Sequence, residues 1–132
     1  MAFGNASRFR QYQQMSSAAM ICDASAHRQI SMLFDGALQK LATAVSGIER
    51  NEPAIKIGAI NGALAIVEYL RMTLDKERGA DVAHNLDMLY EYCMRRLMQA
   101  NAASDAEALR EVSRLLRTVK SGWDEMDLRH VA

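Results

Sequence analysis

The sequence predicts an all-α fold, an antiparallel up-down-up-down four-helix bundle with an apolar N-terminal arm. Four segments repeat apolar residues at steps of three and four, the spacing that places side chains on one face of a helix. No run alternates apolar and polar residues with the two-residue period of a strand. The connections between the four segments are short, which favours antiparallel neighbours over long crossover connections.

The first predicted helix runs from His27 to Arg50. Ser25 is its candidate N-cap, because a serine hydroxyl can accept an early backbone N–H. Asn51-Glu52-Pro53 interrupts the pattern, and Pro53 suits the first turn of the next helix, where its missing N–H is not needed. The apolar stripe of this helix comprises Ile30, Leu33, Ala37, Leu41, Ala44 and Ile48.

The second predicted helix, residues 54–74, carries more apolar surface than one core needs. Its two neighbouring stripes give an apolar arc roughly 200° wide, about twice what a core-facing helix requires. Lys56 and Arg71 interrupt the arc, so we do not expect the helix to be purely interior. One stripe comprises Ile60, Leu64, Val67 and Leu74, and the other Ala59, Ala63, Ile66 and Leu70, with Ile55 and Ile57 at the edges.

A polar turn at residues 75–79 precedes the third predicted helix, residues 81–100. Met88 and Tyr92 lie off its core stripe, which comprises Val82, Leu86, Leu89, Cys93 and Leu97. After a short turn, Ser104-Asp-Ala-Glu107 is typical of a capping box, in which each side chain satisfies the other's free N–H. The fourth helix then carries a seam of Leu109, Val112, Leu116, Val119, Trp123 and Met126.

The chain of 132 residues is expected to form one domain, with a bundle over 25–126 and a frayed tail over 127–132. Residues 1–22 are predicted to be an arm rather than a fifth long helix. The arm's apolar residues, set among Gln, Ser and Ala, are Phe3, Phe9, Tyr12, Met15, Met20 and Ile21.

Composition excludes several classes of protein. The 16 basic residues equal the 16 acidic ones, whereas a nucleic-acid binder should show a basic excess. The same balance gives no reason to expect an anionic membrane as partner. The longest uncharged apolar stretch, Ile57 to Val67, is too short to span a bilayer, and no signal peptide is visible. We therefore expect a soluble cytoplasmic protein.

The residues that could carry catalysis or bind a metal are sparse. A di-iron bundle needs two Glu-x-x-His motifs, and the nearest match is a single Asp81-Val-Ala-His84. Cys22 and His27 have no second ligand pair nearby, so zinc is not expected. Cys93 falls on a core face, where a thiol acts as a small apolar group. No metal, cofactor or enzymatic activity is predicted.

Two classes of function stay open on the residues alone. A histidine phosphotransfer bundle presents an exposed histidine, and His84 is the candidate, but Asp81 and Asp87 beside it would repel phosphate. A helix-binding module is the other class, favoured by the wide apolar arc, the nine methionines and the detached arm. In that interpretation the arm covers the surplus apolar surface until a partner helix replaces it.

Several fragments, taken together and in order, resemble the FliS family of flagellin export chaperones. The resemblance runs from about Phe9 to Met126, with Tyr12 at the place of the family's N-terminal tyrosine. The matching fragments are Ala24-Ser-Ala-His27, Ser31-Met-Leu-Phe-Asp-Gly-Ala-Leu38, Leu74-Asp-Lys-Glu-Arg-Gly79, Asn85-Leu-Asp-Met-Leu-Tyr90 with Tyr92, Arg95-Arg-Leu-Met-Gln-Ala-Asn101, and Leu115-Leu116 through Trp123.

The resemblance implies a helical bundle without catalysis or cofactor that binds the disordered C-terminal segment of flagellin in the cytoplasm. It implies that binding prevents premature polymerisation and assists flagellar type III export. Some members also contact regulators of flagellin synthesis or export-gate components, and some form homodimers. The sequence departs from many members at Ala26, where they carry Pro, and at Gln29, where they carry Leu. The glutamine suggests that the contact between the arm and the bundle is more hydrated at this position.

We predict that ten residues contact the partner. Tyr12 and Met15 would belong to the movable arm, and Arg71 and Arg95 would orient polar groups at the rim of the groove. The predicted groove contacts are Ile57, Ile60, Leu64, Val67, Met88 and Tyr92. For Ile60, Leu64 and Val67, plain packing in the core is the competing interpretation.

Overall fold

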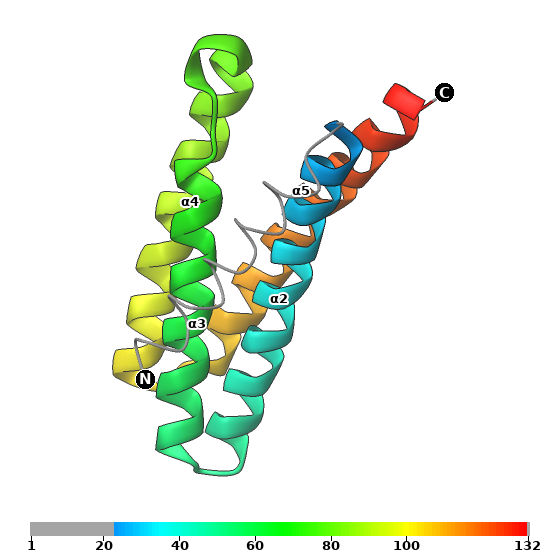
Figure 1. The fold of residues 1–132 in the computed structure, drawn as a ribbon. Coiled ribbons are helices and arrows are strands. Elements are labelled where there is room, and N and C mark those ends of the chain that lie inside the picture. The colour runs from blue at the N-terminus through cyan, green and yellow to red at the C-terminus, as the bar shows by residue number, and fades with distance from the viewer. Residues whose placement is uncertain (1–22, 132) are drawn as a thin grey trace.

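A computed structural model describes residues 23–131 as four helices. They are α2 (Asp23–Glu49), α3 (Pro53–Met72), α4 (Lys76–Ala103) and α5 (Ala106–Val131). Helix α2 packs against α3 and α5, and α4 packs against the same two helices, so the helices form a closed square (Figure 1). The predicted all-α four-helix bundle is confirmed. The predicted arm, with Tyr12, Met15 and Cys22, lies outside the described residues.

The buried core follows the predicted helix faces closely. From α2 it takes Leu33, Ala37, Leu41 and Ala44, and from α5 Leu109, Val112 and Leu116. Both predicted stripes of α3 pack into or against this core, and α4 adds Cys93 and Leu97. By length and composition α3 is also the one described helix that could cross a membrane. Its apolar stripes are instead occupied by contacts within the bundle.

The helix boundaries correct two predicted helix caps. Helix α2 already includes Ser25, which therefore does not cap its start. The expected capping box is wrong, because the Asp105 carboxylate accepts from the N–H groups of Glu107 and Ala108, at 3.1 and 3.2 Å. Ser104 instead adopts a left-handed conformation that ends α4, with φ 51° and ψ 48°.

The polar turn expected at residues 75–79 is partly helical. Asp75 caps the turn by accepting from the N–H of Arg78, at 3.1 Å. Ala80, with φ 45° and ψ −118°, then interrupts the helix and separates this first turn of α4 from the rest. A non-glycine residue held in such a conformation costs about 1–3 kcal/mol.

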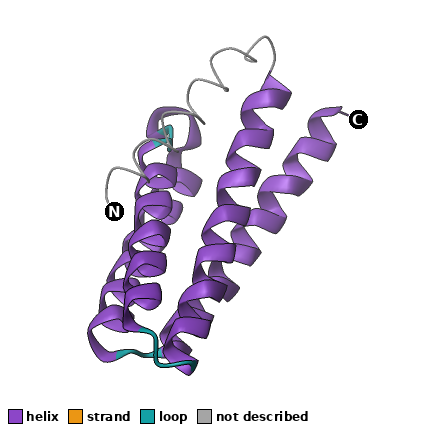
Figure 2. Ribbon diagram, turned by 60° about the horizontal axis from the view of Figure 1, so that its bottom comes forward, coloured by secondary structure: helices purple, strands orange, loops and turns teal. Residues whose placement is uncertain are grey.

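One end of the bundle is tightly joined, and we call it the closed end: the end of α2, the start of α3, the end of α4 and the start of α5. Figure 2 shows the two loops of this end close together. A Cβ added to Gly47 would lie 2.8 Å from the backbone nitrogen of Lys56, so α2 and α3 approach closely here. Lys56 itself is 9% exposed, and its ammonium donates to the Asn101 carbonyl (3.0 Å) and to Ser104 Oγ (2.8 Å).

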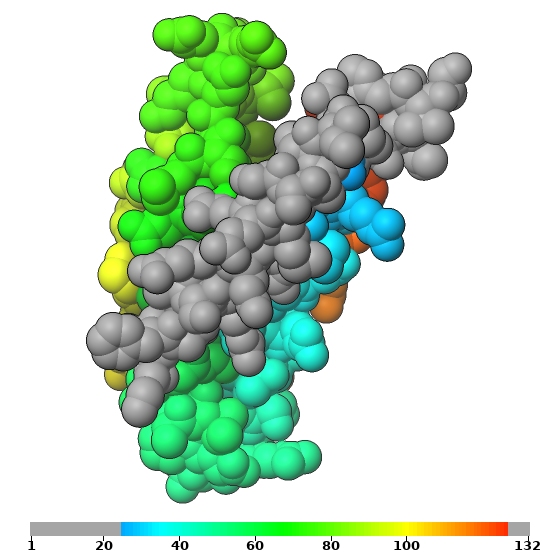
Figure 3. Space-filling view, viewed as in Figure 1, coloured from blue at the N-terminus to red at the C-terminus, as the bar shows by residue number. Residues whose placement is uncertain are grey.

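At the opposite end, which we call the open end, the α2–α5 pair and the α3–α4 pair diverge (Figure 1). In the space-filling view the corner between α3 and α4 projects at the top, apart from α2 (Figure 3). Val82 and Met126 lie on the predicted core stripes but are 66% and 47% exposed. Their assignment to the core was therefore wrong, because the helices separate before these positions are covered.

Candidate partner-binding surfaces

The predicted contact residues fall into three groups in the described structure. Ile60 and Val67 are fully buried and belong to the hydrophobic core, as the competing interpretation held. Ile57, Leu64 and Arg71 lie on α3, on the side that faces α4. Tyr92 lies on the side of α4 that faces α5, and Met88 and Arg95 lie beside it on the outer side of α4. The sequence placed them in one groove, whereas the structure distributes the accessible ones over two faces.

The first surface, the α3–α4 face, has apolar side chains over its closed-end half. Ile57 is 43% exposed and Leu64 is half-buried, seven residues further along the same helical stripe. On α4, Met98 is 53% exposed and Met94 is partly buried against the core. These flexible, polarizable methionines suit a surface that accepts apolar partners of varied shape. Neither methionine was predicted as a contact residue. Both lie on the side of α4 that faces α3, because they follow Asp87 by seven and eleven residues, and Asp87 accepts from Arg71 of α3.

The open-end half of the α3–α4 face is polar. Arg71 Nε donates to Asp87 Oδ1 at 2.7 Å, and Lys76 Nζ lies 3.6 Å from Asp87 Oδ2. The hydrogen bond from Arg71 lowers the pKa of Asp87 below its usual value, and Asp87 in turn raises the pKa of Arg71. A more distant contact joins Arg71 to Glu91, at 3.8 Å. Arg71 is therefore already paired within the chain and holds α3 to α4.

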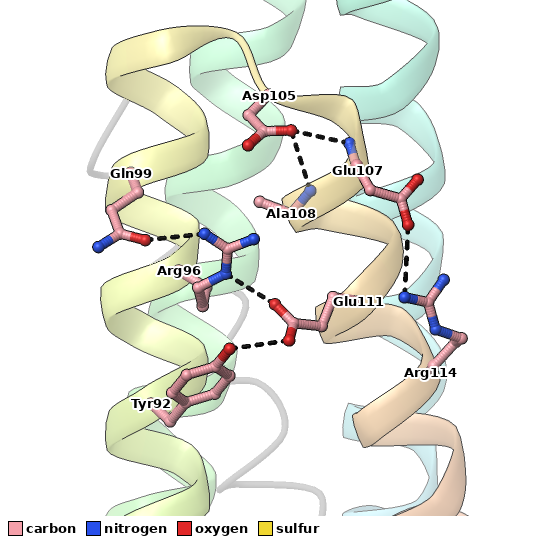
Figure 4. Close-up of polar contacts among 8 residues, drawn as sticks. All are labelled: Tyr92, Arg96, Gln99, Asp105, Glu107, Ala108, Glu111 and Arg114. Carbon is pink, nitrogen blue, oxygen red and sulfur yellow. Dashed lines mark hydrogen bonds and ion pairs between the residues drawn. The ribbon is translucent and has the colours of Figure 1, made fainter.

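The second surface, the α4–α5 face, is organised around Glu111, which was not among the predicted contact residues. Glu111 of α5 accepts from the Tyr92 hydroxyl at 2.8 Å and from Arg96 Nε at 2.7 Å (Figure 4). These two hydrogen bonds lower the pKa of the Glu111 carboxyl, and the first raises the pKa of Tyr92. Arg96 also donates to Gln99, at 2.9 Å. The only signal in the sequence was a glutamate next to the apolar seam, one residue before Val112.

Arg95 and Met88 flank this network on the outer side of α4. Arg95 is exposed, and its guanidinium carbon lies 6.0 Å from the centroid of the Tyr92 ring, within range of a cation–π contact. Met88 is 56% exposed, one helical turn before Tyr92. Both side chains are accessible to a partner.

The structure gives little support to catalytic chemistry. His84 is exposed on the polar side of α4, as predicted, and Cys93 is a free thiol buried in the core. Burial raises the pKa of the Cys93 thiol to about 11, which keeps it protonated and unreactive at neutral pH. Within residues 23–131 no group of three or more His, Cys, Asp or Glu side chains could hold a metal ion.

Comparison with known proteins identifies similar chains. The family model of the flagellar protein FliS matches residues 8–130. The flagellar secretion chaperone FliSB of Pseudomonas aeruginosa is 48% identical over 115 residues, which cover 87% of this chain and 91% of the relative. The flagellar secretion chaperone FliS of Salmonella typhimurium is 38% identical over 122 residues, 92% and 90% of the two chains. That of Bacillus subtilis is 29% identical over 94 residues, 71% and 69%.

Proposed function

The chain belongs to the FliS family of flagellar secretion chaperones, and we propose that its client is the C-terminal segment of flagellin. The chaperone binds this segment in the cytoplasm, prevents premature polymerisation and assists export through the flagellar type III secretion system. Export-gate components and regulators of flagellin synthesis are proposed as further partners, and a homodimer as a further assembly. The activity requires no catalysis and no cofactor.

The observation that supports the proposal is the set of exposed apolar side chains on the α3–α4 face, which do not pack into the core of the bundle. Ile57 and Met98 are 43% and 53% exposed on the α3–α4 face, although neighbouring positions are fully buried. An amphipathic segment can cover such side chains with its own apolar stripe, which is helix-in-groove recognition. Truncating one apolar anchor at the centre of such an interface costs at least about 1 kcal/mol.

A client segment that folds only when it binds is suited to a transient complex with the chaperone. A disordered segment that orders on binding loses conformational entropy, and this loss offsets part of the contact free energy. The net affinity is then moderate for the area buried. A client that must later be released for export benefits from this balance.

The direct test is a calorimetric titration of a flagellin C-terminal peptide into the full-length protein, together with circular dichroism of the mixture. We expect saturable binding and a gain of helix beyond the sum of the separate components. A peptide of the same composition in scrambled order is the control. Absence of binding by the native peptide, or equal binding by the scrambled one, would overturn the proposal.

A further inference from the structure

The first turn of α4 is separated from the rest of the helix, and we call residues 75–79 the strap. It lies at the corner between α3 and α4, at the top of the molecule in Figure 1. Within the strap, the Gly79 N–H donates to the Asp75 carbonyl at 2.8 Å, and the Arg78 N–H donates to Asp75 Oδ1 at 3.1 Å. Ala80 then interrupts the helix. The strap is therefore one closed turn with a break directly after it.

The break after the strap is strained. Ala80 has φ 45° and ψ −118°, a conformation that glycine adopts readily but that the Cβ of alanine disfavours. A residue held in such a conformation persists only where the surrounding contacts stabilise it. The contacts of the strap must therefore offset the strain at Ala80.

Gly79 shows how sharply the chain turns. In a continuous helix, side chains four residues apart have Cβ atoms about 5–6 Å apart. A Cβ added at Gly79 would instead lie 2.7 Å from the Cβ of Ala83, which is itself buried. The strap is thus folded back onto the following turn of α4.

An ion pair connects the strap to the body of α4. Lys76 Nζ lies 3.6 Å from Asp87 Oδ2. In a continuous helix, their Cα atoms would lie about 16.5 Å apart along the axis. The two extended side chains together reach only about 10 Å. The contact therefore depends on the fold-back at Ala80, so the ion pair and the strained backbone belong to the same state of the strap.

The ion pair is a weak latch. The Lys76 side chain is 62% exposed, and an ion pair in contact with solvent contributes little to stability. Arg71 of α3 donates to the same carboxylate at 2.7 Å, so Asp87 keeps a partner when Lys76 leaves. A weak latch opposed by backbone strain leaves a small free-energy difference between two positions of the strap. This is the condition under which a minor conformation is populated.

The strap borders a hollow of about 470 Å3 on the α3–α4 face. Its lining includes Arg71 and Met72 of α3, Met94 of α4, and Leu74 and Lys76. Leu74 is partly buried against the core, so the chain is anchored where the strap begins. Because Lys76 belongs both to the strap and to this lining, a movement of the strap changes the shape of the hollow.

We propose that the strap is a lid with two positions, closed by the ion pair of Lys76 with Asp87 and opened by relaxation of the backbone at Ala80. In the closed position, Lys76 lines the hollow beside Asp87. In the open position, Ala80 returns to an ordinary conformation, Lys76 moves away and the hollow widens. The strap thereby sets how much of the open-end half of the α3–α4 face is accessible. Its motion does not depend on which partner binds that face.

The test is amide hydrogen exchange of the full-length protein, measured by NMR and corrected for the intrinsic rate of each residue. The Arg78 and Gly79 amides report opening of the strap, because both donate to Asp75 in the closed turn. The amide of Leu97, which is fully buried in α4, reports global unfolding. No flagellin peptide is present, so the result is independent of the proposed function.

Two variants change the strap, and each has a matched control. Ala80→Gly relieves the strain of the closed position, and Ala102→Gly places a glycine at an exposed helical position of the same helix. Lys76→Gln removes the latch, and Lys40→Gln makes the same change of charge on α2.

In the parent, we expect the Arg78 and Gly79 amides to exchange at least tenfold faster than that of Leu97. Ala80→Gly should slow the strap amides about tenfold or more. Lys76→Gln should accelerate them about two- to fivefold. Both controls should leave the strap amides unchanged, although Ala102→Gly accelerates global unfolding.

Three results would overturn the lid. Equal exchange of the strap amides and Leu97 in the parent would mean that the strap opens only when the whole bundle unfolds. Unchanged or faster exchange of the strap amides in Ala80→Gly would mean that no strain is relieved when the strap opens. Unchanged exchange in Lys76→Gln would mean that the ion pair with Asp87 does not hold the strap closed.

Discussion

His27 and Trp123 are joined by two reciprocal hydrogen bonds. The indole Nε1–H donates to the His27 carbonyl at 3.0 Å, and His27 Nε2 donates to the Trp123 carbonyl at 2.6 Å. The two rings are stacked, with centroids 4.3 Å apart and an angle of 2° between their planes. This pair ties the start of α2 to the end of α5. Both residues belong to the fragments that resemble the family, although no pattern in the sequence places them together.

Replacing Trp123 by Phe should destabilise the bundle. The substitution keeps an aromatic ring for stacking but removes the N–H that donates to the His27 carbonyl. A hydrogen bond lost from a partly buried site costs about 0.5–1.5 kcal/mol. Urea unfolding should show a lower midpoint with an unchanged slope. An unchanged midpoint would show that the indole N–H contributes nothing to stability.

Replacing Lys56 by Met should also destabilise the protein. The apolar stem is retained, but the Asn101 carbonyl and Ser104 Oγ lose an ammonium donor at the closed end. Hydrogen bonds to charged groups contribute about 1.5–3 kcal/mol. Part of this loss is offset because the variant no longer buries a charged group, so we expect the free energy of unfolding to fall by roughly 1–3 kcal/mol. Chemical denaturation measures it, with Lys40→Met as the control. A more stable Lys56→Met protein would mean that desolvation of the buried ammonium outweighs its hydrogen bonds.

The stability of the bundle should fall as the pH rises above about 9. Burial raises the pKa of Cys93 from 9.0 to about 11 and that of Tyr90 from 10.0 to about 12. Between the unfolded and folded pKa values of each group, the unfolded chain releases a proton that the folded chain retains, so the free energy of unfolding decreases with pH.

The measurement is the urea midpoint at several pH values from about 8 to 11. Cys93→Ala lowers the starting stability by leaving a small cavity, but it should also remove the thiol's share of the alkaline decline. The diagnostic quantity is therefore the slope with pH rather than the stability at one pH. A parent and variant with the same slope would contradict the role assigned to the Cys93 thiol.

Removing residues 1–15 tests the predicted arm, which includes Tyr12 and Met15. If the arm covers apolar surface of the bundle, the shortened protein should bind a hydrophobic dye more strongly, with its helix content in residues 23–131 retained. Dye fluorescence and circular dichroism provide the readouts. Unchanged dye binding would rule out the arm as a cover.

The sequence predicted the helices well because each has a strong apolar period. The seams containing Leu41 and Leu116 are continuous, and the structure buries them as expected. Sequence spacing cannot show where helices separate, so Val82 and Met126 were assigned to a core that does not reach them. It also cannot distinguish a cation at the edge of a stripe from a buried one. Lys56 was therefore interpreted as a sign of exposure, whereas its ammonium is satisfied by groups about 45 residues away in the chain.

The candidate site was less predictable than the fold. Asp87 and Tyr92 are close in the sequence of α4, but they contact different helices. Asp87 accepts a hydrogen bond from Arg71 of α3, whereas Tyr92 donates one to Glu111 of α5. Which neighbour covers which side depends on how the helices pack around α4. That information is tertiary, and a periodic pattern within one helix does not contain it.

The central claim, that the α3–α4 face binds flagellin, is tested most directly by calorimetry of two isoleucine variants with the flagellin C-terminal peptide. Ile57 and Ile55 lie two residues apart on α3, with 43% and 46% exposure, but Ile57 borders α4 and Ile55 borders α2. Ile57→Asp should weaken binding about tenfold or more, equivalent to about 1.4 kcal/mol, while Ile55→Asp binds as the parent does and both keep their helix content. Equal affinity of Ile57→Asp and the parent, or an equal loss in both variants, would contradict the claim.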